Sequence, residues 1–164
     1  MLHIRNALIE DLPQLLAIRN SYVANTIVVF DETPFTSHDI ELWFASYRSF
    51  GPHQLLVAED SGKLLGFCSS QPYRTHPAFS HTIETGISCA LDCRGKGIGS
   101  ALYKSLFETI AGEQLHRAVA GIALPNDASI ALHRKFGFRE VGIFNEYARK
   151  NDKYISSQWL ERHL

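Results

Sequence analysis

The run Arg94-Gly95-Lys96-Gly97-Ile98-Gly99-Ser100 holds the residue types that bind phosphate groups. Alternate glycines let the backbone approach a ligand closely and turn several N–H groups toward it. The run lies between a predicted strand and a predicted helix, and the helix N-terminus adds partial positive charge. Arg94 and Lys96 add full charges. The run therefore predicts a pyrophosphate cradle, although a glycine-rich turn that only starts a helix has the same pattern.

Two better-known phosphate motifs do not fit this run. A Walker A loop needs Gly-Lys followed directly by Ser or Thr, whereas Lys96 is followed by Gly97. A dinucleotide fingerprint needs G-x-G-x-x-G after the first strand and an acidic residue later, whereas this run is G-x-G-x-G in the middle of the chain.

Glu84 is the candidate general base. It lies within a predicted strand, Thr82–Cys89, that leads to the glycine-rich run, and Gly86 and Ser88 share its face. Burial raises the pKa of a carboxyl group toward neutrality and makes the carboxylate a better base. A structural glutamate paired with an arginine or lysine is the alternative.

The elements that position these residues are a mixture of strands and helices. Predicted strands cover Leu2–Asn6, Leu55–Glu59, Leu64–Ser70, Thr82–Cys89, Ala118–Leu124, Glu140–Phe144 and Tyr154–Leu160. Predicted helices begin near Asp11 and at Thr36 or Ser37, and two more cover Ser100–Gly112 and Ala128–Lys135. The pattern predicts a mixed α/β (α+β) fold, a central sheet of about seven strands with about four helices.

Composition narrows the class of protein. The chain has 164 residues, which we interpret as a single domain over residues 1–164, with 16 Lys+Arg and 17 Asp+Glu. This balance argues against a nucleic-acid partner. No stretch is long and apolar enough to span a membrane, and the first residues carry no signal-peptide pattern. Three cysteines without disulfide or metal-ligand spacing fit a cytoplasmic protein that holds no metal.

Three blocks of the sequence resemble one family. Arg94–Gly99 is similar to the R/Q-x-x-G-x-G/A motif of the GNAT superfamily of N-acetyltransferases, and Asn126–Phe138 resembles its N-x-x-S-x-x-L-H-x-x-x-G-F/Y block. Thr82-Ile83-Glu84 also fits. Together they resemble the phosphinothricin N-acetyltransferase branch, which includes acetylases of methionine sulfone and sulfoximine. The resemblance implies a GNAT fold, acetyl-CoA as cofactor and, as in relatives, a homodimer.

The resemblance also implies which residues hold the cofactor. The glycine loop would bind the pyrophosphate, and pantetheine would fill a gap beside the strand Thr82–Cys89, where an N–H near Ile87 would hold the thioester oxygen. Asn126 and Ser129 would contact the same arm, although they also suit a turn and a helix cap. The implied cofactor-binding residues are Ile87, Cys89, Arg94, Gly95, Lys96, Gly97, Ile98, Gly99, Ser100, Asn126, Ser129 and Phe136.

For catalysis, the branch has its base at the position of Glu84, acting through water. His133 stands where most of the family has a tyrosine acid, so it is expected to act as acid or to position the cofactor; a structural histidine is the alternative. The implied substrate-binding residues are Phe30, Tyr73, Arg74, Lys150 and Tyr154. Arg74 suits a carboxylate, although an exposed loop arginine fits as well.

The sequence thus predicts an N-acetyltransferase that moves the acetyl group of acetyl-CoA directly to the primary amine of a small amino-acid-like substrate. Ala148, Asp152 and Ser156 depart from the branch's pattern and weaken the expectation of phosphinothricin itself. Two alternatives stay open: a non-catalytic acyl-CoA-binding module, which needs no Glu84, and a protein N-terminal acetyltransferase. The bulky side chains of Phe30, Phe35 and Tyr73 indicate a closed pocket rather than a peptide groove.

Overall fold

The computed structural model describes residues 1–164. Its strands are β1 (His3–Asn6), β2 (Leu55–Asp60), β3 (Lys63–Pro72), β4 (Thr82–Cys89), β5 (Arg117–Ala123), β6 (Arg139–Lys150) and β7 (Lys153–His163). Its α-helices are α1 (Leu12–Asn25), α2 (Ser37–Ala45), α3 (Ile98–Thr109) and α4 (Asp127–Lys135). Three short 3₁₀ turns cover Ile9–Asp11, Pro77–Phe79 and Leu91–Cys93. No helix combines the length and the apolar composition needed to cross a bilayer.

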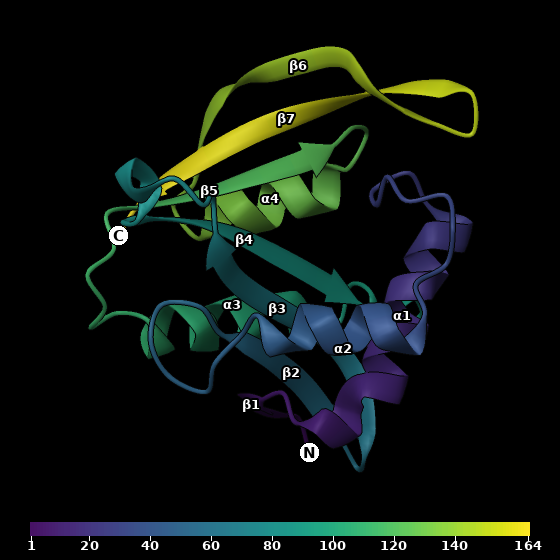
Figure 1. Cartoon of the computed structure of the whole chain (residues 1–164), viewed down its shortest axis with the longest axis vertical. Helices are drawn as coiled ribbons and strands as arrows, with labels where there is room; N and C mark the ends of the chain where they lie inside the picture. Colours follow the sequence, from purple (N-terminus) through teal and green to yellow (C-terminus); the bar gives the residue numbers. More distant parts are fainter.

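All seven strands form one sheet in the order β1-β2-β3-β4-β5-β7-β6 (Figure 1). Every neighbouring pair is antiparallel except β4 and β5, which run parallel with α3 as their connection. The expected mixed sheet of seven strands with four helices is confirmed.

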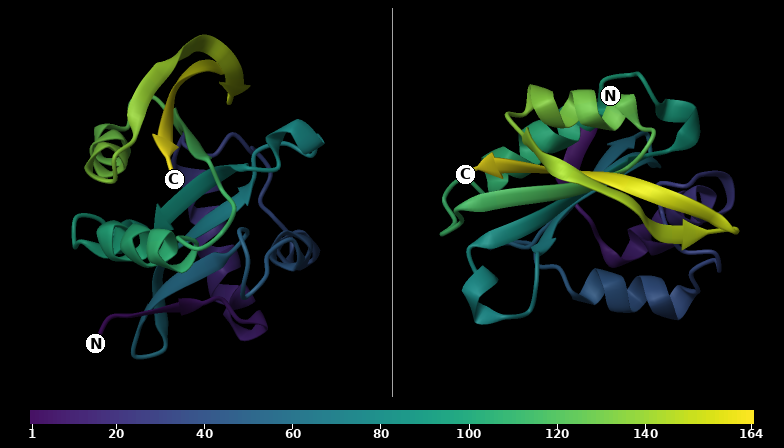
Figure 2. Two further views of the ribbon diagram at one scale, coloured as in Figure 1. Left: turned by 90° about the vertical axis from the view of Figure 1, so that its left-hand side faces the viewer. Right: turned by 90° about the horizontal axis from the view of Figure 1, so that it is seen from above.

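Helices cover both faces of the sheet (Figure 2). On one face, α1 and α2 bury Leu15 and Ile40 against β2 and β3. On the other, α3 buries Leu102 and Leu106 against the central strands, and Ile130 of α4 joins the same cluster. Side chains of a strand alternate between its faces. Ile83 packs in the α3 cluster, so Glu84 faces the side of α1 and α2.

Local sequence explains where the helices begin and end. Thr36 caps α2: its hydroxyl accepts the N–H of Asp39, and the Asp39 carboxylate accepts the N–H of Thr36. α4 ends before Gly137, whose φ of +81° belongs to the left-handed region that glycine adopts without strain.

Several predicted boundaries are wrong. β6 extends to Lys150, well beyond the predicted Phe144, and β7 extends to His163, beyond the predicted Leu160. An irregularity between Phe144 and Ala148 interrupts the alternation of side chains, which hides the second half of β6 from a periodicity search. α3 begins at Ile98, two residues before the predicted start.

The parallel pairing between β4 and β5 is short. It joins Thr82, Ile83 and Glu84 to Arg117, Ala118 and Val119, and no pairing follows. From Thr85 and Ala120 onward the two strands diverge, and Figure 1 shows them separating toward the C-terminal end of β4. The divergence leaves main-chain groups of two central strands without a strand partner, so a side chain, a ligand or water must satisfy them.

Candidate active site

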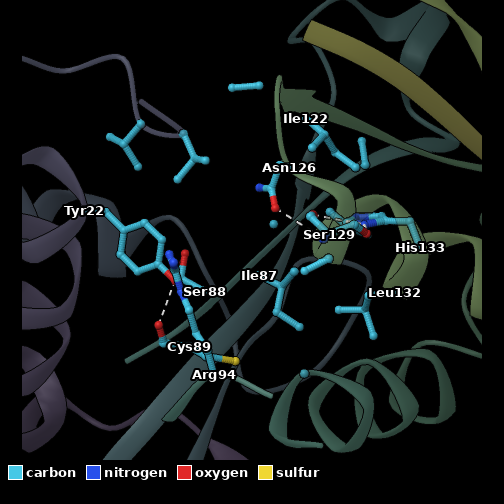
Figure 3. A pocket seen from close by; sticks show the side chains of 18 of the residues that line it. Tyr22, Ile87, Ser88, Cys89, Arg94, Ile122, Asn126, Ser129, Leu132 and His133 are labelled. Atoms are coloured by element: carbon cyan, nitrogen blue, oxygen red, sulfur yellow. Dashed lines mark hydrogen bonds between the residues drawn. The ribbon is translucent and has the colours of Figure 1, made fainter. Parts of the chain in front are cut away.

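A cavity of about 500 Å³ lies where β4 and β5 diverge (Figure 3). β4 and β5 form two of its walls, the loop before α3 closes one end, and α4 lies along its side. Its lining residues are Tyr22, Val28, Val29, Thr85–Cys89, Arg94, Gly95, Gly97, Gly99, Ser100, Ala120–Ala123, Asn126, Ala128, Ser129, Leu132 and His133.

The main-chain groups that face this cavity can be identified from the strand register. In an antiparallel pair, alternate residues bond to the partner strand. Thr82 O accepts from β3 and the N–H of Ala90 donates to Leu65, so the even-numbered residues of β4 are bonded to β3. The N–H and C=O of Ile87 and Cys89 therefore point away from β3, into the gap.

The same register argument applies to β5. Its pairing with β7 ends with the N–H of Leu124 donating to Ser156, which places the even-numbered residues in the bonds to β7. Gly121 and Ala123 therefore turn their main-chain groups toward β4. The gap offers main-chain donors and acceptors on both walls, as an extended chain between two strands requires.

The glycine-rich run connects β4 to α3 at one end of the cavity. Gly95 and Gly97 have φ of +75° and +78°, so both positions require the left-handed backbone that glycine tolerates. No side chain caps the first turn of α3. Its N–H groups therefore remain free for an anion beside the cavity.

Arg94 supplies a cation at this end. Its guanidinium lies 5.2 Å from the centre of the Tyr22 ring, and the Tyr22 hydroxyl donates a 2.7 Å hydrogen bond to the Cys89 carbonyl (Figure 3). α1 thereby holds both the arginine and the end of β4 in place. That bond also occupies one acceptor of the Cys89 carbonyl, which leaves Ile87 as the freer main-chain contact.

Three of the residues predicted to bind cofactor do not line the cavity. The Lys96 ammonium folds back and donates to the carbonyl of Asp92 at 3.0 Å. Ile98 is buried in the core, so only its N–H can reach a ligand. Phe136 packs edge-on against Tyr103 in an aromatic cluster behind the cavity, which contradicts its predicted contact with the pantetheine arm.

Asn126 and Ser129 lie in the cavity wall and also cap α4. The N–H of Ser129 donates to the Asn126 side-chain oxygen at 3.3 Å. The cap and the cavity contact thus coexist, as the sequence allowed, and the cap fixes the two side chains relative to each other.

His133 is buried, only 3% exposed, and both of its ring nitrogens have partners. Nδ1 lies 2.7 Å from the carbonyl of Ser129, and Nε2 lies 2.8 Å from the Tyr103 hydroxyl. Because a carbonyl only accepts, Nδ1 carries the proton and Nε2 accepts from Tyr103. Burial lowers the pKa of His133, which keeps it neutral. No N–H of this ring is free to protonate a leaving group, so the geometry favours the structural histidine that the sequence left open.

Glu84 lies outside the cavity lining, on the face of the sheet that α1 and α2 cover. It is half-buried, and its carboxylate has no hydrogen bond or ion pair in the protein; burial alone raises its pKa. Tyr47, in the loop after α2, is close enough for the Glu84 charge to add to the rise that burial causes in the Tyr47 pKa. The ion-paired glutamate left open by the sequence is therefore wrong.

Tyr73 and Arg74 follow β3 on the same side as Glu84. Tyr73 lies edge-on to Phe79 and Trp159, with ring centres 5.5 and 6.2 Å away. The Arg74 guanidinium rests over Tyr73 and Phe79, is exposed, and has no carboxylate partner. Phe30 lies in the loop between α1 and α2, beside Tyr147.

The structure contradicts the predicted contact between Lys150 and the substrate. Lys150 is 2% exposed, and its ammonium donates to the carbonyls of Val23, Thr26 and Val29 at 2.7–2.9 Å. All three of its donors are thus used to hold the loop after α1. Tyr154 is 67% exposed near the tip of the β6–β7 hairpin and does not reach the cavity, so its predicted contact is not made either.

Sequence reasoning missed several residues of the site. Val28 and Val29 line the cavity from an irregular loop with no motif, and Thr85 carried no pattern beyond its strand. Lys135 of α4 donates to the Ser100 hydroxyl at 3.0 Å, which places a second cation beside the first turn of α3. A lysine within a helix gives no signal of such a contact until α3 and α4 are placed together.

Known proteins are similar to this chain in sequence and in fold. A phosphinothricin N-acetyltransferase of Streptomyces coelicolor is 45% identical over 98% of this chain and 95% of its own. An L-methionine sulfoximine/L-methionine sulfone acetyltransferase of Pseudomonas paraeruginosa is 34% identical over 98% and 94%. The structure of a GNAT superfamily phosphinothricin acetyltransferase of Sinorhizobium meliloti in complex with acetyl-CoA is 27% identical, with a TM-score of 0.93 over 99% of this chain and 88% of that one.

The family profile described as "Acetyltransferase (GNAT) family" matches residues 15–138, which include the glycine-rich loop and most of the cavity wall. The predicted family, the acetyltransferase activity and the acetyl-CoA cofactor are therefore confirmed. The match, the shared fold and the extent of the relatives' identity together show that the chain belongs to the acetyltransferase (GNAT) family.

Proposed function

We propose that the protein transfers the acetyl group of acetyl-CoA to the primary amine of a small amino-acid-like acceptor, directly within a ternary complex. The observation that carries this proposal is the gap between β4 and β5. It joins an uncapped helix N-terminus at one end to the region of an unpaired, half-buried glutamate at the other.

The cofactor would lie along the gap. Its pyrophosphate would accept from the N–H groups of the Gly95–Ser100 loop and lie near the Arg94 guanidinium. Lys135, beside Ser100, is placed to add a further charge contact. The pantetheine arm would pair with the main chain of Ile87 and Gly121 as an added strand. Asn126 and Ser129 would contact it from α4.

Glu84 would act as the general base through a water molecule. The acceptor nitrogen attacks the thioester carbon while its proton passes through water to the Glu84 carboxylate. An N–H at Ile87 would stabilise the negative charge on the carbonyl oxygen. The C–S bond then breaks, and the thiolate of CoA leaves and takes a proton from water, since His133 has none to give.

The acceptor would bind on the side of the sheet where Tyr73, Arg74 and Glu84 lie. The unpaired Arg74 guanidinium suits a carboxylate, and the rings of Tyr73 and Phe79 hold it in place. Two relatives are named as acetyltransferases of phosphinothricin and of methionine sulfoximine and sulfone. These names support an acceptor of this class.

The test is CoA thiol release from acetyl-CoA with a panel of amines at equal concentration: methionine sulfone, methionine sulfoximine, phosphinothricin, spermidine and a short peptide. The two methionine derivatives should react fastest, and Arg74→Ala should raise their KM with little change in acetyl-CoA affinity. Preference for the peptide would favour a protein N-terminal acetyltransferase. Acetyl-CoA binding without turnover of any amine would favour a non-catalytic module.

We also propose a homodimer formed through β6. This strand pairs only with β7, so its other edge is open. Large apolar side chains, each at least 48% exposed, cluster on the β6–β7 hairpin: Val141, Ile143, Phe144, Tyr147 and Tyr154. Light scattering on the purified protein should give twice the mass of one chain, and Phe144→Glu should give a single chain. A wild-type monomer would refute the proposal.

Residues 1–164 are proposed to act as one catalytic domain in the cytoplasm. All strands join one sheet, and all three cysteines are free, which suits a reducing compartment.

A further inference from the structure

Tyr103 of α3 lies fully buried behind the cavity, where its hydroxyl meets a residue of each wall. Its hydroxyl lies 2.8 Å from Nε2 of His133 on α4 and 3.3 Å from the hydroxyl of Thr85 on β4. Thr85 and His133 both line the cavity, whereas Tyr103 does not. One hydroxyl thus connects the β4 wall to the α4 wall.

The direction of each hydrogen bond in this series follows from the position of the proton on the His133 ring. The Ser129 carbonyl requires a proton on Nδ1 of His133, so the neutral ring accepts at Nε2 from the Tyr103 hydroxyl. The Tyr103 oxygen can then only accept from Thr85. Burial raises the pKa of Tyr103, which keeps its proton in place. Each polar group in the chain is satisfied by its neighbour.

These hydrogen bonds cross between two parts of the fold that no strand pairing joins beyond Glu84. α3 packs on β2, β3 and β4, whereas α4 follows β5 and leads into β6. The parallel pairing that joins β4 to β5 stops at Glu84, and Thr85 is the next residue. The Tyr103 hydroxyl therefore connects the two parts where the strands begin to separate.

We propose that Tyr103 is a positioning residue for acetyl transfer, whose bonds to Thr85 and His133 hold the floor of the gap at the width that the pantetheine arm needs. This inference rests on the proposed placement of that arm. Without the hydroxyl, Thr85 and Nε2 of His133 are left buried without partners, so the walls must shift or admit water.

The test compares acetyl-CoA with adenosine 3′-phosphate 5′-diphosphate, which keeps the nucleotide and its pyrophosphate and lacks the pantetheine arm. Titration of Tyr103→Phe should show the Kd of acetyl-CoA rise about tenfold, the effect of losing roughly one buried hydrogen-bond pair. The Kd of adenosine 3′-phosphate 5′-diphosphate should stay within twofold of wild type. Thr85→Val, which removes the other hydroxyl, should act in the same direction, and Thr85→Ser should restore most of the affinity.

Phe107→Leu is the matched control, because Phe107 packs against Tyr103 from the next turn of α3 and carries no polar group. It should lower thermal stability by at least as much as Tyr103→Phe while leaving both Kd values unchanged. Equal loss of both ligands in Tyr103→Phe, or weakened acetyl-CoA binding in Phe107→Leu, would show a merely structural role. A wild-type protein that gains no affinity from the pantetheine arm would refute the proposed placement, and the inference with it.

Discussion

The substitution Glu84→Gln tests the proposed base without disturbing the rest of the site. The substitution preserves shape and removes the charge, and it breaks no ion pair because the Glu84 carboxylate has none. Burial raises the pKa of this group toward the pH at which the enzyme works, where a general base is most effective. A positioned base contributes about 10²–10⁴ in rate, which corresponds to about 2.7–5.4 kcal/mol of the barrier.

The assay follows CoA thiol release with methionine sulfone across pH 6–10. In wild type, kcat/KM should fall on the acidic side as Glu84 and the amine take up protons. In Glu84→Gln, kcat should fall by about 10²–10⁴ at neutral pH, with the acetyl-CoA Kd unchanged. Activity should recover partly at high pH, where more of the amine is already neutral.

The pH dependence of folding stability provides an independent test of the Glu84 carboxyl group. The folded-state pKa of Glu84 lies above its unfolded value, so the folded protein binds more protons between the two values. Wild-type stability therefore falls as pH rises through that window. Glu84→Gln should unfold at a higher temperature than wild type above the window, and the difference should vanish below it. The variant would be less active and more stable.

Glu108→Gln serves as the control for loss of a negative charge, because Glu108 lies 66% exposed on α3, where its nearest partner is Lys104. It should change neither kcat nor the pH profile. Near-normal turnover of Glu84→Gln at pH 7, or an identical loss in Glu108→Gln, would refute the assignment of Glu84 as the base.

Three further substitutions test the rest of the site. Gly97→Asp should abolish acetyl-CoA binding in a calorimetric titration because it puts a negative charge at the start of α3. Gly62→Asp, at a similar φ of +80° in the β2–β3 turn outside the cavity lining, should bind normally despite the same backbone strain. Lys150→Met should lower the unfolding free energy by about 2–4 kcal/mol by removing three charged hydrogen bonds, whereas the exposed Lys153→Met should not; an unchanged melting temperature with a raised acceptor KM would instead support the substrate contact. Lys135→Ala should raise the acetyl-CoA Kd about threefold to tenfold, more at low salt than at high salt, and a salt-independent effect would argue against a phosphate contact.

The predicted residues that the structure brings to the cavity are placed there by short stretches of chain. The glycine loop places its own N–H groups through its own φ angles, as Gly95 and Gly97 show. Asn126 and Ser129 lie three residues apart and meet through a helix cap. In such cases the residues that interact are neighbours in sequence, so their spacing is enough to predict how they are arranged.

The predictions that failed depend on contacts between distant segments. Lys150 matched a basic position of the family, but its ammonium meets the carbonyl of Val23, 127 residues away. His133 matched the position of an acid, but Tyr103 and the Ser129 carbonyl take both ring nitrogens. Tertiary contacts decide which hydrogen-bond donors of a side chain stay free to bind a ligand. A local sequence pattern does not show these contacts.

The chain topology explains why the glycine loop, the gap between β4 and β5, and Glu84 follow one another along the sheet. β4 and β5 are parallel, so α3 must cross over between them, and it begins where β4 ends. The N-terminus of α3 therefore lies at the same end of the sheet as the opening between the strands. The strands stay paired at Glu84 and separate beyond it. Glu84 is thus held at the closed end and the glycine loop at the open end, and an extended ligand lying between them would reach both.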